Sequence, residues 1–408
     1  MSKQDEKERV VIVGAGPVGM VCALALNRAG VPVTVFEQEP APVEDQRAAT
    51  IHPPTLEMLD ALGVTQKILP LGLISTTYRF HDRLHRSVVA EFDLDRMRDE
   101  FKFPFVLQYE QYKLTASIAA EYANAGDFDV RFSHGVTGLS ETADGVEIAY
   151  ATPDGGGRLS AAYVIGCDGG RSTVRKLAGI DFEGFTYPER FIKIATSFDF
   201  GTVNRDLALR NYFSDPDEWC NLFKVRGKRP PGLWRAIFPV GNDETDEVAL
   251  SAERIEARLQ KFFPRQGRYQ VEYVNVYPVS QRVAATFRKG RVLLAGDSAH
   301  VNNPIGGMGM NGGIHDGINL ADKLARVFKR EAGEELLALY SRQRRHVAVE
   351  YVQAQTIANK KLMEERDPAA RAAKLAELGR IADDPQASKA YMRRAALLDS
   401  LQIASAVT

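Results

Sequence analysis

The chain is poor in cysteine and has no long apolar run. Its 408 residues include only Cys22, Cys167 and Cys220, which lie far apart and form no CxxC pair. An odd and dispersed set of thiols argues against a disulfide framework or a metal site, and indicates reduced, buried thiols. No apolar segment approaches the length of a membrane span, and the polar N-terminus lacks a signal-peptide core. We therefore expect a cytoplasmic protein with no metal and no integral membrane segment.

An excess of charge of either sign is also missing. Lys and Arg number 52 and Asp and Glu number 53, so the formal net charge is -1. A nearly neutral chain does not favour nucleic acid or an acidic membrane as a partner. Hydrophobic residues make up 45% and charged residues 26%, which is typical of a soluble globular protein. The length allows two domains or one large two-part domain.

The first informative stretch predicts a strand, a glycine turn, a helix, a second strand and an acid. It comprises the apolar run 10–13, Gly14-Ala15-Gly16-Pro17-Val18-Gly19, an apolar helix pattern to residue 29, the apolar run 33–36 and Glu37. Gly14 permits the turn, Gly16 lets the backbone approach a pyrophosphate, and Gly19 lets the helix pack on the strand. Glu37 stands where an acid accepts hydrogen bonds from a ribose. The pattern predicts an adenine dinucleotide and leaves both NAD and FAD open.

Two later strands also end at an aspartate followed by a turn. The run 162–167 leads to Asp168-Gly169, with Ser172 at the start of a helix. The run 291–295 leads to Gly296-Asp297, and a glycine-rich loop then opens a helix expected to begin near Asn311. Because ligands collect at the carboxyl ends of parallel strands, these aspartates indicate a site rather than plain turns.

An aromatic segment, residues 181–282, predicts a mostly antiparallel sheet with strands near 191–200, 207–213, 218–225, 233–239 and 270–278. Trp234 and Phe238 fall on one face of their strand, where they line either a flat apolar pocket or ordinary sheet core. From residue 322 onward the pattern is helical and partly basic, as on a solvated helix face.

We therefore predict an α/β protein: a Rossmann-like dinucleotide-binding domain with an inserted, mostly antiparallel sheet and a C-terminal helical segment. The predicted boundaries are 1–75, 99–182 and 283–330 for the dinucleotide-binding domain, 76–98 and 183–282 for the inserted sheet, and 331–408 for the helices. Contacts within a homodimer are one role for these helices.

With these three motifs in order, the chain resembles the flavin-dependent aromatic hydroxylases of the para-hydroxybenzoate hydroxylase type. The resemblance implies that the Rossmann-like domain is an FAD-binding domain and that the inserted sheet is a substrate-binding domain. The sequences of the first and third motifs are similar to those in the branch that includes 3-(3-hydroxyphenyl)propionate and resorcinol hydroxylases. Two small residues, Ser298 and Gly317, stand where the family more commonly has alanine. We expect these replacements to have no effect on function. The chain is too short for the thioredoxin-like domain of phenol hydroxylases.

The resemblance implies particular residues. The implied FAD contacts are Gly14, Gly16, Pro17, Val18, Gly19, Glu37, Gln38, Arg47, Gln108, Asp168, Gly169, Gly296, Asp297, Gly309, Met310 and Asn311. Asp168 and Gly169 also serve the nicotinamide cofactor by this resemblance, and Asp297 binds the ribityl chain. Arg47 on residue type alone is equally a solvated surface arginine. The residues expected beside the reacting atoms are Pro304, Gly307, Met310 and Asn311, and the candidate substrate contacts are His52, Tyr212, Phe223, Trp234, Phe238 and Pro304.

The implied chemistry belongs mainly to the cofactor. NADH or NADPH reduces FAD, dioxygen adds to give a flavin C4a-hydroperoxide, and its distal oxygen attacks an electron-rich ring beside a phenol hydroxyl. Alternatives are another flavoenzyme on this fold, such as a halogenase or a reductase-type flavoprotein, and a non-enzymatic dinucleotide-binding redox protein. The run 232–237 has only one of the two tryptophans of the halogenase GWxWxI motif.

Overall fold

The computed structural model describes residues 9–44, 46–123 and 125–408. Its first layer is a six-stranded sheet of order β18-β19-β12-β1-β2-β8, parallel except for β18. The strands are β1 (Val10–Val13), β2 (Val33–Phe36), β8 (Phe128–Arg131), β12 (Tyr163–Gly166), β18 (Arg288–Lys289) and β19 (Val292–Leu294). Valine, isoleucine and leucine fill β1, β2, β12 and β19 because parallel strands are buried on both faces.

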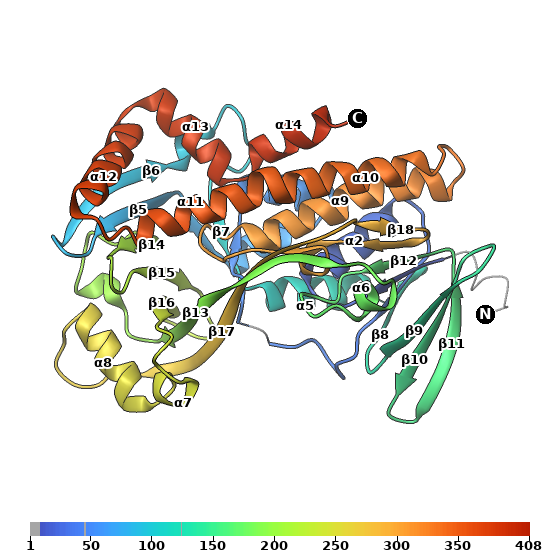
Figure 1. Cartoon of the computed structure of the whole chain (residues 1–408), viewed down its shortest axis with the longest axis horizontal. Helices are drawn as coiled ribbons and strands as arrows, with labels where there is room; N and C mark the ends of the chain where they lie inside the picture. Colours follow the sequence, from blue (N-terminus) through green and yellow to red (C-terminus); the bar gives the residue numbers. More distant parts are fainter. Residues whose placement is uncertain (1–8, 45, 124) are drawn as a thin grey trace.

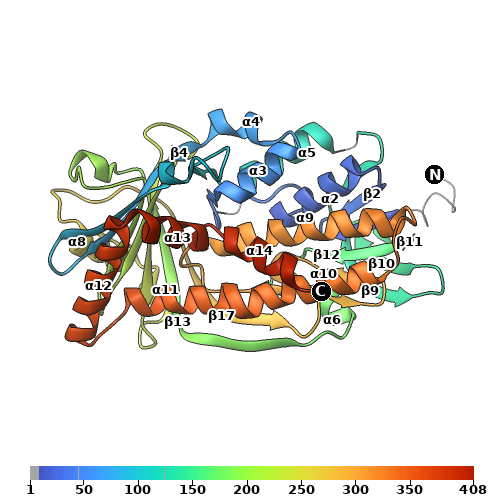
Figure 2. The same cartoon turned by 90° about the horizontal axis from the view of Figure 1, so that it is seen from above.

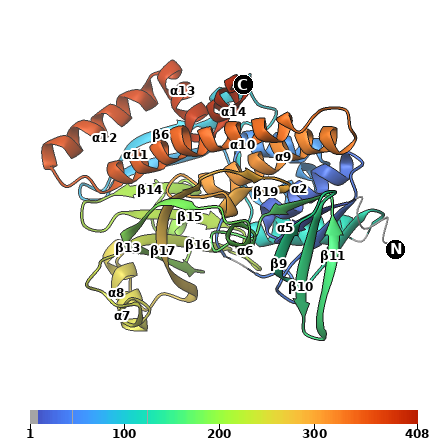
Figure 3. The same cartoon turned by 45° about the vertical axis from the view of Figure 1, so that its right-hand side comes forward.

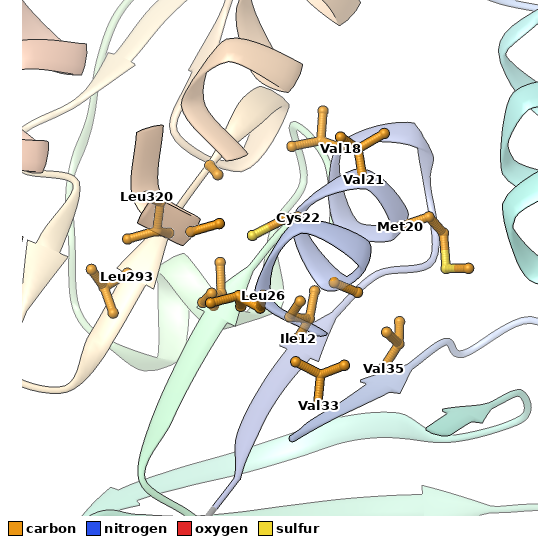
Figure 4. Close-up of a cluster of buried hydrophobic side chains, with 14 of the residues drawn as sticks. Ile12, Val18, Met20, Val21, Cys22, Leu26, Val33, Val35, Leu293 and Leu320 are labelled. Carbon is orange, nitrogen blue, oxygen red and sulfur yellow. The ribbon is translucent and has the colours of Figure 1, made fainter. Parts of the chain in front are cut away.

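Helices cover this sheet and bury its apolar residues. Helix α2 (Pro17–Arg28) packs against α5 (Gln111–Tyr122) and α9 (Met308–Phe328). Figure 4 shows Ile12, Cys22, Leu26, Leu293 and Leu320 meeting in the core between these elements. Contact between α2 and α9 is close because Gly317 faces Cys22, where an added Cβ would lie 3.2 Å from the Cys22 Cβ.

The second large sheet has eight strands in the order β20-β17-β13-β16-β15-β14-β5-β6. They are β5 (Thr77–Asp82), β6 (Ser87–Asp93), β13 (Phe182–Thr196), β14 (Arg210–Ser214), β15 (Cys220–Val225), β16 (Leu233–Val240), β17 (Val271–Ala284) and β20 (His300–Val301). Neighbours are antiparallel except for β14 and β5. This confirms the predicted mixed α/β fold with a mostly antiparallel second sheet.

Strands β13 and β17 are longer than the sequence suggested. Our prediction placed the first of them at 191–200, but β13 begins at Phe182 and ends at Thr196, and β17 continues to Ala284. Pro188 and Gly184 obscured the start, since both residues usually end a strand. In the structure the pairing shifts register between Thr186 and Arg190, which accommodates the proline in a bulge. The two long strands run between the two layers (Figure 1).

Smaller elements complete the fold. A three-stranded sheet projects at one end (Figure 3), and the chain forms a second three-stranded sheet of order β3-β7-β4. Their strands are β9 (Gly135–Glu141), β10 (Val146–Thr152) and β11 (Gly155–Ala161), and β3 (Thr50–Ile51), β4 (Leu73–Ser75) and β7 (Val106–Gln108). Short helices are α3 (Pro53–Ala61), α4 (Thr65–Ile68), α6 (Thr173–Leu177), α7 (Asp246–Ala249) and α8 (Ala252–Phe262).

The C-terminal helices run the length of the molecule and then turn back (Figure 2). They are α10 (Glu335–His346), a π-helical stretch (Val347–Gln353), α11 (Ala354–Met363), α12 (Pro368–Asp383), α13 (Pro385–Ala395) and α14 (Leu398–Ala406). Helix α10 packs on α9, and α12 packs on β6, so the segment contacts both layers. Among the described helices, none has the length and apolar character that crossing a bilayer requires.

Candidate active site

The three sequence motifs meet at one edge of the parallel sheet. Strands β19, β12, β1 and β2 are neighbours and run in the same direction. Their carboxyl ends therefore place Asp297, Asp168, Gly14 and Glu37 along one edge, as expected for a nucleotide site.

Glycines let the backbones of these motifs touch. Gly14 has φ +104°, and an added Cβ would lie 2.5 Å from the carbonyl oxygen of Cys167. An added Cβ at Gly313 of α9 would lie 3.0 Å from Gly296 Cα and 2.7 Å from Val18 Cγ2. Side chains at these positions would push the motifs apart, so the glycines are required for packing before any ligand binds.

Other glycines leave open space, as a dinucleotide requires. No atom lies within 4 Å of a Cβ built on Gly16 or Gly169. Gly16 is the N-cap of α2, which has no side-chain cap and no acid in its first turn. Helix α9 starts in the same way at Gly307, with φ 69°. The uncapped N–H groups of α2, beside the open space at Gly16, suit the pyrophosphate of FAD, and those of α9 suit an anionic ring edge.

Helix α9 begins at Met308, three residues before the predicted position near Asn311. The Asn311 side chain is buried and fully engaged: Nδ2 donates to the carbonyl oxygens of Thr50 and Gly307, and Oδ1 accepts from the His52 amide. Asn311 thus ties β3 to the glycine loop. Met310 points into the core, whereas Met308 lines the cavity described below. Side chains two positions apart on a helix point to nearly opposite sides.

The acids at the edge organise the turns that carry them. Glu37 Oε2 accepts a hydrogen bond from the Ala15 amide at 2.8 Å, and Oε1 accepts from the Glu39 amide at 3.0 Å. Asp168 accepts from the amides of Thr173 and Val174 at 2.7 and 3.0 Å, at the start of α6, whose N-cap is Ser172. Each carboxylate is fixed by the backbone and keeps lone pairs available for a ligand.

Arg47 and Asp297 face each other across the edge of the sheet. Arg47 Nη1 lies 3.8 Å from Asp297 Oδ2, and both side chains are substantially exposed. Gln108 is buried; its Oε1 accepts from Thr50 Oγ1 at 2.8 Å and its Nε2 donates to the carbonyl oxygen of Lys224. Gln38 is exposed at the end of the site. Ser298 donates to the carbonyl oxygen of Ala295 at 2.8 Å and to that of Gly166, so it joins β12 to the third motif.

A mostly apolar cavity lies beside the glycine loop. His52 and Tyr212 line it, as do Ile305 and Gly306, whereas the neighbouring Pro304 is exposed. A Cβ added to Gly307 would lie 3.6 Å from His52 Nε2, so His52 stands where the loop and the cavity meet.

Other predicted substrate contacts lie elsewhere. Trp234 and Phe238 belong to a separate buried cluster between the second sheet and α8, because their face of β16 points toward that helix. Phe223 packs edge-on against Tyr212, with ring centroids 5.5 Å apart, and lies behind the cavity wall. The structure therefore does not bring Trp234, Phe238 or Phe223 to the cavity.

Several lining residues were not found from sequence. They include Tyr78, Phe80, Arg210, Met363 and Tyr391. Tyr78 and Phe80 share one face of β5, but nothing in the local sequence shows what that face contacts. Arg210 carried no sequence signal, since a single arginine in a strand is ordinary.

The cavity holds buried polar atoms that lack partners. Among the described residues, Arg210 Nε, the Tyr78 hydroxyl and both ring nitrogens of His52 have no hydrogen-bond partner. Arg210 is 5% exposed, its Nη2 donates to the Tyr212 hydroxyl at 3.2 Å, and its guanidinium lies 5.0 Å from the centre of the Tyr78 ring. No carboxylate of the described residues lies within ion-pair distance of it. Leaving such groups unpaired costs about 1–3 kcal/mol each, more for a charge, which favours a polar ligand here.

Burial sets the protonation states around Arg210. Burial lowers the pKa of His52 well below its usual range, and the positive charge of Arg210 lowers it further, although the backbone of Ala396 favours the protonated form. His52 is therefore neutral at physiological pH. Burial raises the pKa of Tyr78, so its hydroxyl stays protonated and able to donate.

Comparison with known proteins agrees with this geometry. The model of the FAD binding domain family matches residues 7–355. A para-nitrophenol 4-monooxygenase from Pseudomonas sp. (strain WBC-3) is 34% identical over 365 residues, covering 89% of each chain. A 3-(3-hydroxy-phenyl)propionate/3-hydroxycinnamic acid hydroxylase from Mycolicibacterium smegmatis is 34% identical, covering 82% of this chain and 58% of that protein. The crystal structure of p-nitrophenol 4-monooxygenase PnpA from Pseudomonas putida DLL-E4 superposes with TM-score 0.90 and 31% identity, covering 98% of each chain.

The chain therefore belongs to the FAD binding domain family. Within it, the protein is an FAD-dependent aromatic monooxygenase, as the sequence resemblance predicted. The open cradle at Gly16 and Gly169 and the two uncapped helix N-termini fit that cofactor.

Proposed function

We propose that this enzyme hydroxylates a small phenol that carries an anionic or strongly electron-withdrawing group, with NADH or NADPH as electron donor. Arg210 is the observation that carries this proposal: a buried cation without a carboxylate partner among the described residues, in a cavity walled by aromatic rings. A phenolate, carboxylate or nitro oxygen would accept its hydrogen bonds.

The overall reaction adds one oxygen atom from O₂ to the ring. A phenol, O₂, NAD(P)H and a proton give the hydroxylated phenol, NAD(P)⁺ and water. Bound FAD supplies the electron transfer and the activation of O₂. The protein must bind the ring, orient it and exclude water.

The cavity residues can perform these tasks. The positive charge of Arg210 favours the ionised substrate, and ionisation makes the ring richer in electrons. Neutral His52 can accept a hydrogen bond from a substrate hydroxyl through a free ring nitrogen, and Tyr78 can donate one. Aromatic and aliphatic side chains around these groups keep the site dry.

We further propose how this chain holds FAD. The backbone N–H groups of Gly16, Val18 and Gly19 donate to the pyrophosphate, and Pro17, which has no N–H, starts α2 beside it. Glu37 with Gln38 faces the ADP ribose, and Asp168 and Gly169 serve both FAD and the nicotinamide donor. Asp297, Arg47 and Gln108 bind toward the ribityl part. The N-terminus of α9, with Gly309, Met310 and Asn311, stabilises negative charge on the reduced ring through its dipole. Pro304 and Gly307 stand beside the reacting atoms.

The para-nitrophenol 4-monooxygenase supports the choice of substrate, since its name describes a small phenol with an electron-withdrawing group. The larger hydroxyphenylpropionate hydroxylase supports an aromatic substrate more generally, but this chain spans 58% of it.

A substrate panel tests the proposal. Purified protein should be yellow and release FAD on denaturation. Phenol, 4-nitrophenol, 4-hydroxybenzoate and 3-(3-hydroxyphenyl)propionate would be scored for stimulated NADH or NADPH oxidation and for ¹⁸O from ¹⁸O₂ in the product. We expect at least one charged or nitro-substituted member to exceed phenol.

Arg210→Gln should remove that preference, and Arg79→Gln should preserve it. Arg79 is the matched control because it lies on the adjacent strand and pairs with Glu91 instead. A preference for uncharged phenol in the wild type, or an unchanged preference in Arg210→Gln, would contradict the proposal.

Cytoplasmic location and a homodimeric assembly also remain proposals. All three cysteines are free thiols, which supports a reducing compartment. Cell fractionation and light scattering of the purified enzyme would test the two points separately.

A further inference from the structure

The C-terminal helices supply part of the cavity wall. Asn359, Leu362 and Met363 of α11 and Tyr391, Met392 and Ala395 of α13 line it. The family model ends at residue 355, so all six lie beyond the region that the family shares. This part of the cavity wall is thus built by residues beyond the match to the family model.

Tyr391 closes this wall by aromatic packing. Its ring stacks on Phe92 with centroids 4.4 Å apart and an interplanar angle of 17°. It also meets Phe80 edge-on at 6.4 Å, and Phe80 in turn stacks on Tyr212 at 4.9 Å. Removing the Tyr391 ring would extend the space beside Phe80.

Helix α13 is held firmly in this position. Asp384 caps its N-terminus by accepting from the Ala387 amide at 2.7 Å. Lys389 Nζ lies 2.6 Å from Asp99 Oδ2 and 3.0 Å from Glu100 Oε1, and Arg393 also pairs with Glu100. On the opposite side, the Tyr351 hydroxyl donates to the carbonyl oxygen of Arg394 at 2.7 Å. A wall fixed from two sides does not yield easily to a larger ligand.

We propose that Tyr391 sets the size limit of the substrate, so that specificity within this enzyme is decided by a helix beyond the shared FAD-binding region. This inference rests on the proposed function, because it takes the cavity to be the substrate site. An apolar wall discriminates by size, and one methylene group is worth about 10- to 200-fold in kcat/KM when a pocket rejects it.

Binding measurements test this independently of turnover. Dissociation constants for the FAD-loaded enzyme would be measured by calorimetry for hydroxyphenyl carboxylates whose side chain grows from no methylene group to two. For the wild type, we expect affinity to fall at least about 10-fold along the series. Tyr391→Ala should flatten or reverse that fall, and Tyr391→Phe should keep it.

Two further variants serve as a fallback and as a control. Tyr391→Leu keeps part of the packed volume and should shift the profile in the same direction if Tyr391→Ala does not fold. Arg394→Ala, on an exposed side chain of the same helix, should match the wild type.

The outcomes separate this inference from the proposed function. The same size profile in the wild type and in the folded Tyr391→Ala and Tyr391→Leu variants would overturn it. Failure of the whole ligand series to bind both the wild type and these variants would also overturn it. Wild-type binding without any hydroxylated product would overturn the proposed function and leave the size limit standing.

Discussion

Asp316 and Arg344 form a buried ion pair beneath the dinucleotide edge, with 2.6 Å between Arg344 Nε and Asp316 Oδ1. The second carboxylate oxygen accepts from the Gly296 amide at 3.1 Å and contacts His300 Nε2 at 2.8 Å. Arg344 lies on α10, so a C-terminal helix positions the turn that presents Asp297.

Breaking this pair should destabilise the protein and weaken FAD binding together. Arg344→Met leaves Asp316 buried without its partner, which costs about 3–5 kcal/mol in the free energy of unfolding. Urea denaturation and fluorescence titration with FAD would measure both effects. Arg342→Met, on an exposed neighbour of the same helix, should change stability by less than about 0.5 kcal/mol. Equal losses in the two variants would refute the role of the pair.

The same pair predicts acid sensitivity. Burial alone would raise the pKa of Asp316, but the charges of Arg344 and His300 outweigh it and hold the pKa at about 2, below the ordinary 3.8. A carboxyl whose folded pKa is depressed contributes stability above its unfolded pKa and loses it as pH falls through the folded value. Stability should therefore decline between about pH 4 and pH 2, and Asp316→Asn should show a flatter curve in that range.

Arg210 should be unfavourable for stability in the absence of substrate. A buried cation without an anionic partner is costly, so Arg210→Met should unfold at an equal or higher temperature than the wild type. The same change should raise KM for the anionic substrate by about 10- to 100-fold, the equivalent of one charge-assisted hydrogen bond. Calorimetric melting would measure the effect of Arg210→Met on stability, and steady-state kinetics would measure its effect on KM. A lower melting temperature would indicate that Arg210 is a structural residue.

Glu37 should matter for FAD affinity more than for the fold. Its carboxylate holds the Ala15 amide and faces the open cradle at Gly16, so Glu37→Gln should raise the FAD dissociation constant by about 10-fold through a lost charge-assisted hydrogen bond. Glu39→Gln is the control, because that neighbouring side chain is exposed. Unchanged FAD affinity in Glu37→Gln would show that the Glu37 carboxylate does not bind the ribose of FAD.

A buried hydrogen-bond network should hold the glycine-rich loop in position. Gln281 Nε2 donates to Thr356 Oγ1 at 3.0 Å and Gln281 Oε1 accepts from the Asn303 amide at 3.0 Å. Thr356→Val would leave Gln281 partly unpaired and should accelerate hydrogen exchange at residues 303–307, with a loss of about 1–3 kcal/mol in stability.

Thr356→Ser keeps the hydroxyl and should restore slow exchange. If valine and serine behave alike, the loop does not depend on this hydroxyl.

The dinucleotide edge could be read from sequence because each motif is local. In the stretch from Val10 to Glu37, a strand, turn, helix and second strand follow one another, and hydrophobic periodicity with glycine spacing encodes that order directly. Even here the structure added roles that the sequence did not show. Gly14 allows close contact with Cys167 as well as the turn. The Asn311 side chain hydrogen-bonds to backbone groups.

The cavity could not be read in this way. Alternation in β16 correctly put Trp234 and Phe238 on one face, but a period of two does not say which face meets α8 and which meets a ligand. Pro188 and Gly184 likewise concealed the start of β13, whose pairing with β17 comes from a segment far along the chain.

By itself the sequence determined the fold class and the dinucleotide-binding edge, because these depend on short segments with fixed spacing. The resemblance of its three motifs to the aromatic hydroxylases added the FAD-dependent class of enzyme. Only the tertiary structure decided the substrate cavity. His52, Tyr78, Arg210 and Tyr391 come from four distant segments, and each has an ordinary local context. Their shared chemistry, a buried cation among aromatic rings, exists only after the second sheet and the C-terminal helices pack together.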